Sequence, residues 1–134
     1  MTLTATLPFA ALALSIGLLL AACAQRLTAP ATEPMVYLAA ETRLVARDIV
    51  DITTSIAHPI AGANAAYGDC VAAQYALIRG LSHVSRLTTE QTGQGDIVSE
   101  KTSFLLSSVA PGGKFVLNAT EIVEKCKHSR IPTV

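Results

Sequence analysis

The sequence lacks the motifs by which catalytic and ligand-binding sites are usually recognised. It contains no Gly-x-Ser-x-Gly nucleophile elbow, no Gly-x-x-x-x-Gly-Lys phosphate loop and no Cys-x-x-Cys pair. Tryptophan is absent, and the ten Lys and Arg residues balance the ten Asp and Glu residues. No basic field is therefore available to attract nucleic acid. We expect a protein that is not an enzyme, carries no cofactor and has no nucleic-acid partner.

Metal ligands are also sparse. The segment Cys126-Lys127-His128 offers a thiolate and an imidazole, but the other histidines, His58 and His83, are isolated in the sequence. A structural zinc site needs four ligands, which usually come as two spaced pairs. We therefore expect no metal site.

Charge is missing altogether from the first 25 residues, and the segment from Leu7 to Ala22 consists almost entirely of Ala, Leu and other apolar residues. An apolar run that ends in small residues is typical of an export signal. This run is about sixteen residues long, whereas a membrane-spanning helix needs roughly 20. An export signal is thus favoured over a retained membrane anchor.

The end of the apolar run, Leu20-Ala21-Ala22-Cys23, resembles the lipobox of bacterial lipoproteins. In that family the chain is cut before the Cys, and the Cys carries the lipid. The resemblance implies cleavage between Ala22 and Cys23, lipidation of Cys23 with acyl chains such as palmitate, and attachment to the membrane through this lipid. Ala24 in place of Asp favours the outer membrane. The alternative is a plain secretory signal with an incidental Cys23, and the absence of Lys and Arg from the first six residues departs from the usual leader.

Lipidation of Cys23 would leave Cys70 and Cys126 as an even pair in an oxidising compartment, where disulfides form. We predict a structural disulfide between them that joins the helix to the sheet. The alternatives are two separate buried thiols or one redox-active cysteine.

The chain is expected to have three parts: a signal peptide (1–22), a lipidated Cys with a flexible Pro-containing tether (23–34) and a small α+β domain (35–134). In the domain, period-two alternation predicts a strand over Leu44–Ile56. Asn64 as N-cap and Gly80 after the last turn delimit a predicted helix. Turn residues then separate three further predicted strands, over His83–Thr92, Ile97–Val109 and Lys114–Lys125.

The resulting fold class is α+β in the order β-α-β-β-β, with one helix packed on a mostly antiparallel four-stranded sheet. One segment leaves an alternative open. Asn118 followed by Glu121 is also a capping-box pattern that would open a helix within 118–128, although β-branched and aromatic residues favour strand there.

An Ala-rich helix that ends in Gly and runs directly into a strand, as in Gln74–His83, behind a lipobox resembles several small lipoprotein families of Gram-negative envelopes. The resemblance implies a fold and a location, namely the periplasmic side of the cell envelope, but no activity. We therefore expect a non-enzymatic binding or structural module for another envelope component, which would dock at an exposed strand edge. The alternative is a lipoprotein that binds a small ligand or lipid in a groove between helix and sheet.

Overall fold

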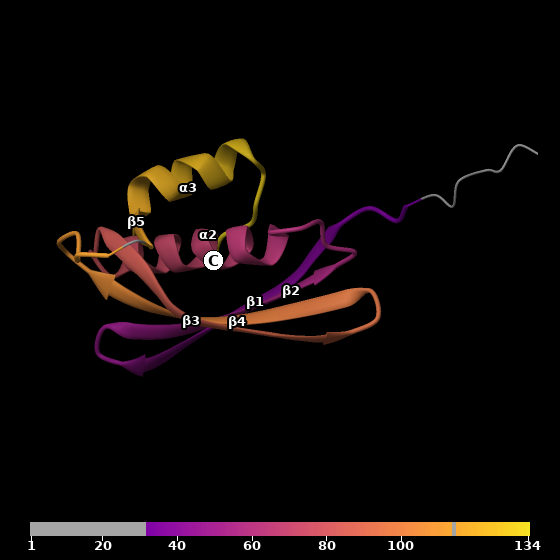
Figure 1. Ribbon diagram of the computed structural model, residues 1–134. Coiled ribbons are helices and arrows are strands. Elements are labelled where there is room, and N and C mark those ends of the chain that lie inside the picture. Colours follow the sequence, from indigo (N-terminus) through magenta and orange to yellow (C-terminus); the bar gives the residue numbers. More distant parts are fainter. Residues whose placement is uncertain (1–31, 114) are drawn as a thin grey trace, which may run out of the picture. The chain divides into compact units, whose positions relative to one another are not determined.

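Two long β-hairpins lie side by side and build most of an antiparallel sheet (Figure 1). The computed structural model describes residues 32–113 and 115–134. Five strands pair in the order β1-β2-β4-β3-β5, and every neighbouring pair is antiparallel. The elements along the chain are β1 (Val36–Ala46), β2 (Ile49–Ala57), α2 (Ala63–Ile78), β3 (His83–Gln94), β4 (Ile97–Ser107), β5 (Val116–Asn118) and α3 (Ala119–His128).

One face of the sheet is apolar and carries α2. On β2 every second residue is fully buried, as period-two alternation requires when one face meets a core. Phe104 and Leu106 on β4 extend this face, and Gly68 of α2 lies directly over the ring of Phe104. The small residues of α2 let the helix approach the sheet closely. Those that are fully buried are Ala72, Ala73 and Ala76.

The second helix, α3, lies over α2 and forms a third layer (Figure 1). Because α2 is held between the sheet and α3, it is buried on two sides and shows no simple apolar stripe. Val123 and Cys126 of α3 point into this second interface and are almost fully buried. Neither helix of the described residues is long and apolar enough to cross a membrane.

The predicted fold class is wrong in its element count and order. The described residues contain five strands and two helices in the order β-β-α-β-β-β-α, rather than one helix on a four-stranded sheet. The helix that ends at Gly80 and the hairpin of β3 and β4 agree with the prediction to within a few residues. The differences lie in the first strand and in the last segment.

The predicted single strand Leu44–Ile56 spans a hairpin turn. Arg47 and Asp48 form the turn between β1 and β2, so that Asp48 does not belong to a strand. In the sequence, the alternation of apolar and polar residues continues through this turn, so that the pattern gives no sign of the turn. The rest of β1 shows no regular alternation because register shifts occur at Leu38 and at Val45, and each shift moves the following side chains to the other face.

The predicted strand Lys114–Lys125 is also wrong. Only Val116–Asn118 pair with β3, and the chain then turns into α3. The side chain of Asn118 accepts a hydrogen bond from the backbone N–H of Glu121 at 3.2 Å, as an N-cap does. The capping alternative therefore describes this segment, because burial on α2 at helical spacing outweighs the β propensity of Ile122 and Val123.

Asn64 is not the N-cap of α2. The helix begins at Ala63, after Gly62, which has the positive φ of 79° that glycine tolerates. Asn64 lies in the first turn and points inward. Its amide nitrogen donates to the carbonyl oxygen of Val98 at 3.3 Å, and its oxygen accepts from the hydroxyl of Thr54 at 3.3 Å. The Asn64 side chain thus forms hydrogen bonds with two strands of the sheet instead of capping the helix.

Candidate functional site

The side chains that could bind a metal ion are scattered over the described residues. Within residues 32–113 and 115–134, no group of three or more His, Cys, Asp and Glu side chains is close enough to hold a metal ion. Cys126 is consumed by a disulfide, and Nδ1 of His128 lies 2.7 Å from the carbonyl oxygen of Glu124 in its own helix. The candidate site therefore has to be sought on the surfaces.

The disulfide joins Cys70 to Cys126 with a Cα–Cα distance of 5.9 Å. These are the two cysteines that the sequence pairs, but the elements they connect differ from the expectation. Cys70 lies on α2 and Cys126 on α3, so that the bridge joins two helices instead of a helix and the sheet. It ties the third layer of the domain to the second.

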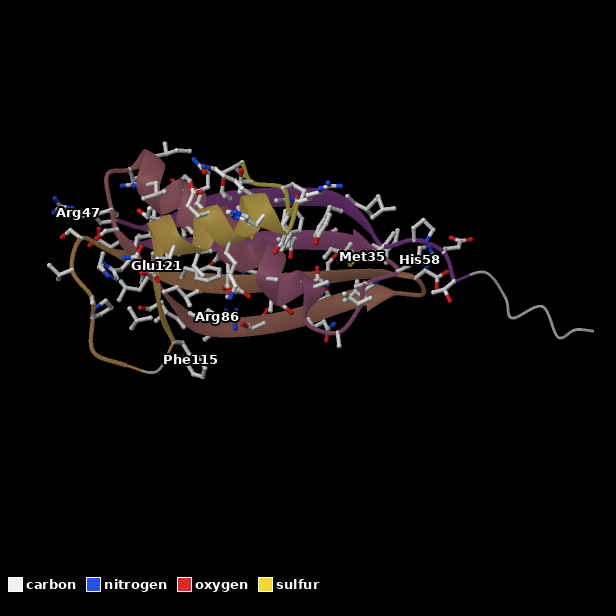
Figure 2. The ribbon with its side chains drawn as sticks, turned by 90° about the horizontal axis from the view of Figure 1, so that it is seen from above. Met35, Arg47, His58, Arg86, Phe115 and Glu121 are labelled. Atoms are coloured by element: carbon white, nitrogen blue, oxygen red, sulfur yellow. A yellow bond between two sulfur atoms is a disulfide. The ribbon has the colours of Figure 1, made fainter. Side chains whose placement is uncertain are left out.

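The predicted cleavage and lipidation site, Ala22 and Cys23, lies outside the described residues. The first described residues, 32–35, lead into β1. Glu33 contacts Nε2 of His58 at 2.7 Å, and the backbone N–H of His58 donates to the carbonyl of Asp96 in the turn between β3 and β4. Figure 2 shows Met35 and His58 at one end of the sheet and Arg47 at the other. The end that carries His58 is thus the end at which the chain enters the domain.

Both edges of the sheet present backbone that no described strand pairs. β1 is the first edge, and it has β2 on one side only. Four large apolar side chains of β1 are about half exposed: Val36, Leu38, Leu44 and Val45. Natural sheets usually cover or shorten such an edge, because its free N–H and C=O groups can pair with another strand.

The second edge is β3, which is only partly covered. β5 pairs with His83, Val84 and Ser85, and the remainder of β3, from Arg86 to Gln94, has no partner strand on that side among the described residues. The side chains from Leu87 to Gly93 are exposed. Phe115, immediately before β5, is 64% exposed. The first residue of β5, Val116, therefore lies beside the point at which the open stretch of β3 begins.

The face of the sheet opposite α2 is polar. Asp51 of β2 accepts a hydrogen bond from the hydroxyl of Ser103 at 2.6 Å and forms an ion pair with Nζ of Lys101 at 3.1 Å. The hydrogen bond from Ser103, together with the charge of Lys101, lowers the pKa of Asp51 below its ordinary value. Ser55 and Ser99 share a further hydrogen bond of 2.7 Å. Cross-strand pairs thus join the polar side chains of this face.

One ion pair lies between α2 and the sheet. Arg86 of β3 donates from Nε to Asp69 at 2.8 Å, and a second hydrogen bond from its guanidinium completes a bidentate pair. The hydrogen bond to Asp69 raises the pKa of Arg86. The guanidinium and the carboxylate thus satisfy each other's hydrogen bonds, and the pair connects α2 to β3.

Two shallow apolar pockets adjoin one another beside α2. The first, of about 200 Å³, lies between α2 and α3 next to the disulfide. The second, of about 320 Å³, lies between the start of β1 and the loop before α2. Both are lined by Ala66, Ser129 and Ile131, and the two together are called the groove beside α2. The space between α2 and the sheet, where the sequence places a groove, is filled by core side chains.

The fold and its surfaces define a small three-layer domain with an open antiparallel sheet. The chain belongs to the family described as the YNQ4 C-terminal domain, which matches residues 37–130. The description of the family names no activity, ligand or partner. No curated protein and no solved structure matches the chain.

The sequence did not point to three of these features. The pairs Asp69–Arg86 and Asp51–Ser103 join residues that are far apart in the chain, and neither has a local signal. The open edges follow from the strand order, which a sequence pattern does not contain. The contact between Asn64 and Thr54 had a partial signal, since a buried Asn at the start of an apolar helix needs a partner.

Proposed function

We propose that this protein is a lipid-anchored lipoprotein of the bacterial envelope that acts as a non-enzymatic binding module for another envelope protein. The observation that supports the binding role is the open edge of β3 from Arg86 to Gln94. A strand added there would continue the position of β5 and gain main-chain hydrogen bonds. The exposed ring of Phe115 would flank its end.

The anchor part of the proposal rests on the lipobox at Leu20–Cys23. Residues 23–34 span at most about 40 Å when fully extended. A domain on such a tether stays close to the membrane surface, and its local concentration near other envelope proteins is raised. The envelope partner is therefore a protein that approaches the membrane to which the lipid is attached.

The experiment is site-specific photo-crosslinking in intact cells. A photoreactive amino acid replaces Glu90, an exposed residue of the β3 edge, in the full chain. The matched control carries the same amino acid at Glu121, an exposed residue on α3 (Figure 2). Crosslinked species are isolated and identified by mass spectrometry.

We expect one envelope protein to be crosslinked from position 90 and not from position 121. A second pair of samples carries Cys23→Ser, and crosslinking to that protein should fall when the anchor is removed. If position 90 yields the same background as position 121, the β3 edge is not a docking site and the binding proposal fails.

A second candidate is a small apolar ligand, such as a lipid chain, in the groove beside α2. The observation that favours it is that the two pockets are neighbours, with a mainly apolar lining that includes Met35 and Ile122. Native mass spectrometry of the purified full chain tests this candidate. A co-purified ligand that is lost in Ala66→Trp, which would fill the shared part of the groove, supports it. Protein that carries no added mass contradicts it.

A further inference from the structure

The other edge of the sheet, β1, carries a charge pattern that the proposed function does not use. Between the register shifts at Leu38 and Val45, the residues Ala39–Leu44 pair regularly with β2. Their side chains alternate, so that Glu41 and Arg43 lie on the polar face while Thr42 and Leu44 lie on the face of α2. Glu41, Thr42, Arg43 and Leu44 are all exposed.

A strand of this kind can pair with a copy of itself if the register is permitted. In an antiparallel pair, a residue whose N–H and C=O point outward must meet another residue of that kind, and such residues alternate along the strand. Self-pairing of the regular stretch can therefore be centred on a single residue but not between two neighbouring residues. The available centres near the middle are Glu41, Thr42 and Arg43.

Charge selects among these three centres. Pairing centred on Glu41 places two glutamates opposite each other, and pairing centred on Arg43 places two arginines opposite each other. Like charges directly opposite on one face are destabilising. Pairing centred on Thr42 places Glu41 of each copy opposite Arg43 of the other, which gives two attractive pairs by symmetry.

The apolar side chains agree with the same register. Centring on Thr42 brings Leu44 of each copy opposite Ala40 of the other, on the face of the sheet that carries α2. Leu44 is 46% exposed in the single chain. Because this arrangement keeps the helices of both copies on one side, Leu44 would gain apolar contact without a clash between polar and apolar faces.

We propose that β1 is a self-association edge, and that two copies pair antiparallel about Thr42 to form one continuous ten-stranded sheet. The register shifts at Leu38 and Val45 limit the regular pairing to the central residues. Pairing at β1 leaves the open part of β3 free in both copies. This dimer does not depend on the envelope partner proposed above, and either can exist without the other.

The test uses the full chain with Thr42→Cys, produced in the envelope of a Gram-negative host. Directly opposed residues in an antiparallel pair have Cα atoms about 4.5–5.5 Å apart, which lies within the Cα–Cα range of disulfides. The control is Thr92→Cys, an exposed threonine on the other edge of the sheet. We expect a reducible dimer from Thr42→Cys and, at equal expression, about tenfold less from Thr92→Cys. Equal crosslinking from the two positions would overturn the proposal.

The register is tested by charge reversal in the Thr42→Cys background. Glu41→Arg places Arg opposite Arg, and Arg43→Glu places Glu opposite Glu, so that each variant alone should crosslink about fivefold less. When the two variants are produced together with tags of different size, each Arg meets a Glu, and the mixed dimer should return to the level of the parent. Thermal unfolding of each variant verifies that it is folded, because Arg43 also faces Asp51 across β1 and β2.

Recovery in the mixed dimer supports the centre at Thr42. If the mixed dimer forms no better than the two single variants with themselves, the charge-selected register is wrong. Photo-crosslinking at Glu90 reports on the envelope partner separately, so that loss of the dimer and loss of the partner are distinguishable.

Discussion

At the scale of single residues, the polar groups that stabilise this fold either join neighbouring strands or join α2 to the sheet. Asp51 illustrates the point. Its carboxylate is only 14% exposed, and it is satisfied by the Ser103 hydroxyl and by Lys101. These contacts favour the charged form of the carboxylate in the folded chain. The free energy of unfolding therefore depends on pH.

Asp51→Asn should weaken the acid dependence of stability. The pKa of Asp51 in the folded chain is below its ordinary value of 3.8. Its contribution is therefore fully present above the ordinary value and is lost as the pH falls through the lowered one. We expect the variant to lose about 1 kcal/mol at neutral pH and to show a shallower loss of unfolding free energy between about pH 5 and pH 2.

Urea unfolding at several pH values measures this effect. Asp48→Asn is the control, because Asp48 is exposed in the turn between β1 and β2. An unchanged slope in Asp51→Asn would show that the Ser103 and Lys101 contacts contribute nothing to the pH dependence.

Asn64→Ala should be more costly. The substitution removes the donor to the carbonyl of Val98 and the acceptor of the Thr54 hydroxyl, and Thr54 is 1% exposed. Buried polar groups left without a partner cost about 1–3 kcal/mol. Equilibrium unfolding in urea checks this, with Gln91→Ala at an exposed position of β3 as a control expected to change less than about 0.5 kcal/mol. Equal stability of the two variants would contradict the role assigned to Asn64.

At the scale of elements, the sequence predicts those that are bounded by local signals and misses those that depend on contacts far along the chain. α2 ends at Ile78, followed by Arg79 as C-cap and then Gly80 as predicted, because the glycine adopts the positive φ that stops a helix. β1 was missed because its two register shifts break the alternation that identifies a strand. α3 was assigned to the last strand because its apolar residues are β-branched, and only packing on α2 decides between helix and strand.

Asn118→Ala should destabilise α3. The Asn118 side chain accepts from the backbone N–H of Glu121, and loss of such a cap costs about 1 kcal/mol. Asn118→Asp retains the acceptor and should retain most of the stability. Thermal unfolding of the two variants beside the wild type gives the comparison. Equal loss in both variants would show that the cap is not the source of the effect.

Removal of the disulfide should have the largest effect on the two helical layers. Cys70 and Cys126 close a loop with a sequence separation of 56. The chain-entropy model gives about 4 kcal/mol for a loop of this length. We expect the variant with Cys70→Ser and Cys126→Ser to lose several kcal/mol of unfolding free energy, measured by urea unfolding beside wild type.

Wild-type protein unfolded in the presence of a thiol reductant serves as the control, and its stability should approach that of the double variant. If both retain the stability of the oxidised wild type, the packing of α3 on α2 alone holds the third layer.

At the scale of the whole molecule, the two edges of the sheet and the end at which the chain enters β1 are separate surfaces. β1 carries alternating charge, β3 carries an open stretch beyond β5, and the chain enters beside His58. The sequence suggests the compartment through its lipobox, and the cysteine pair through the number of cysteines left over. It does not suggest which edges are open, because strand order is fixed by pairing between distant segments.

The proposed lipid anchor should determine how the entire chain partitions between detergent and water. Lipidation of Cys23 with two or more acyl chains would bind the protein stably to a membrane, since each buried methylene contributes about 0.8 kcal/mol. Wild type should therefore enter the detergent phase in Triton X-114 partitioning, and Cys23→Ser should move to the aqueous phase. The Cys70→Ser and Cys126→Ser double variant keeps Cys23 and should partition as wild type does.

If Cys23→Ser remains in the detergent phase, the apolar segment itself is retained as the anchor. If wild type is found in the aqueous phase, the segment is a plain secretory signal, and the tether in the proposed function has no lipid to hold it.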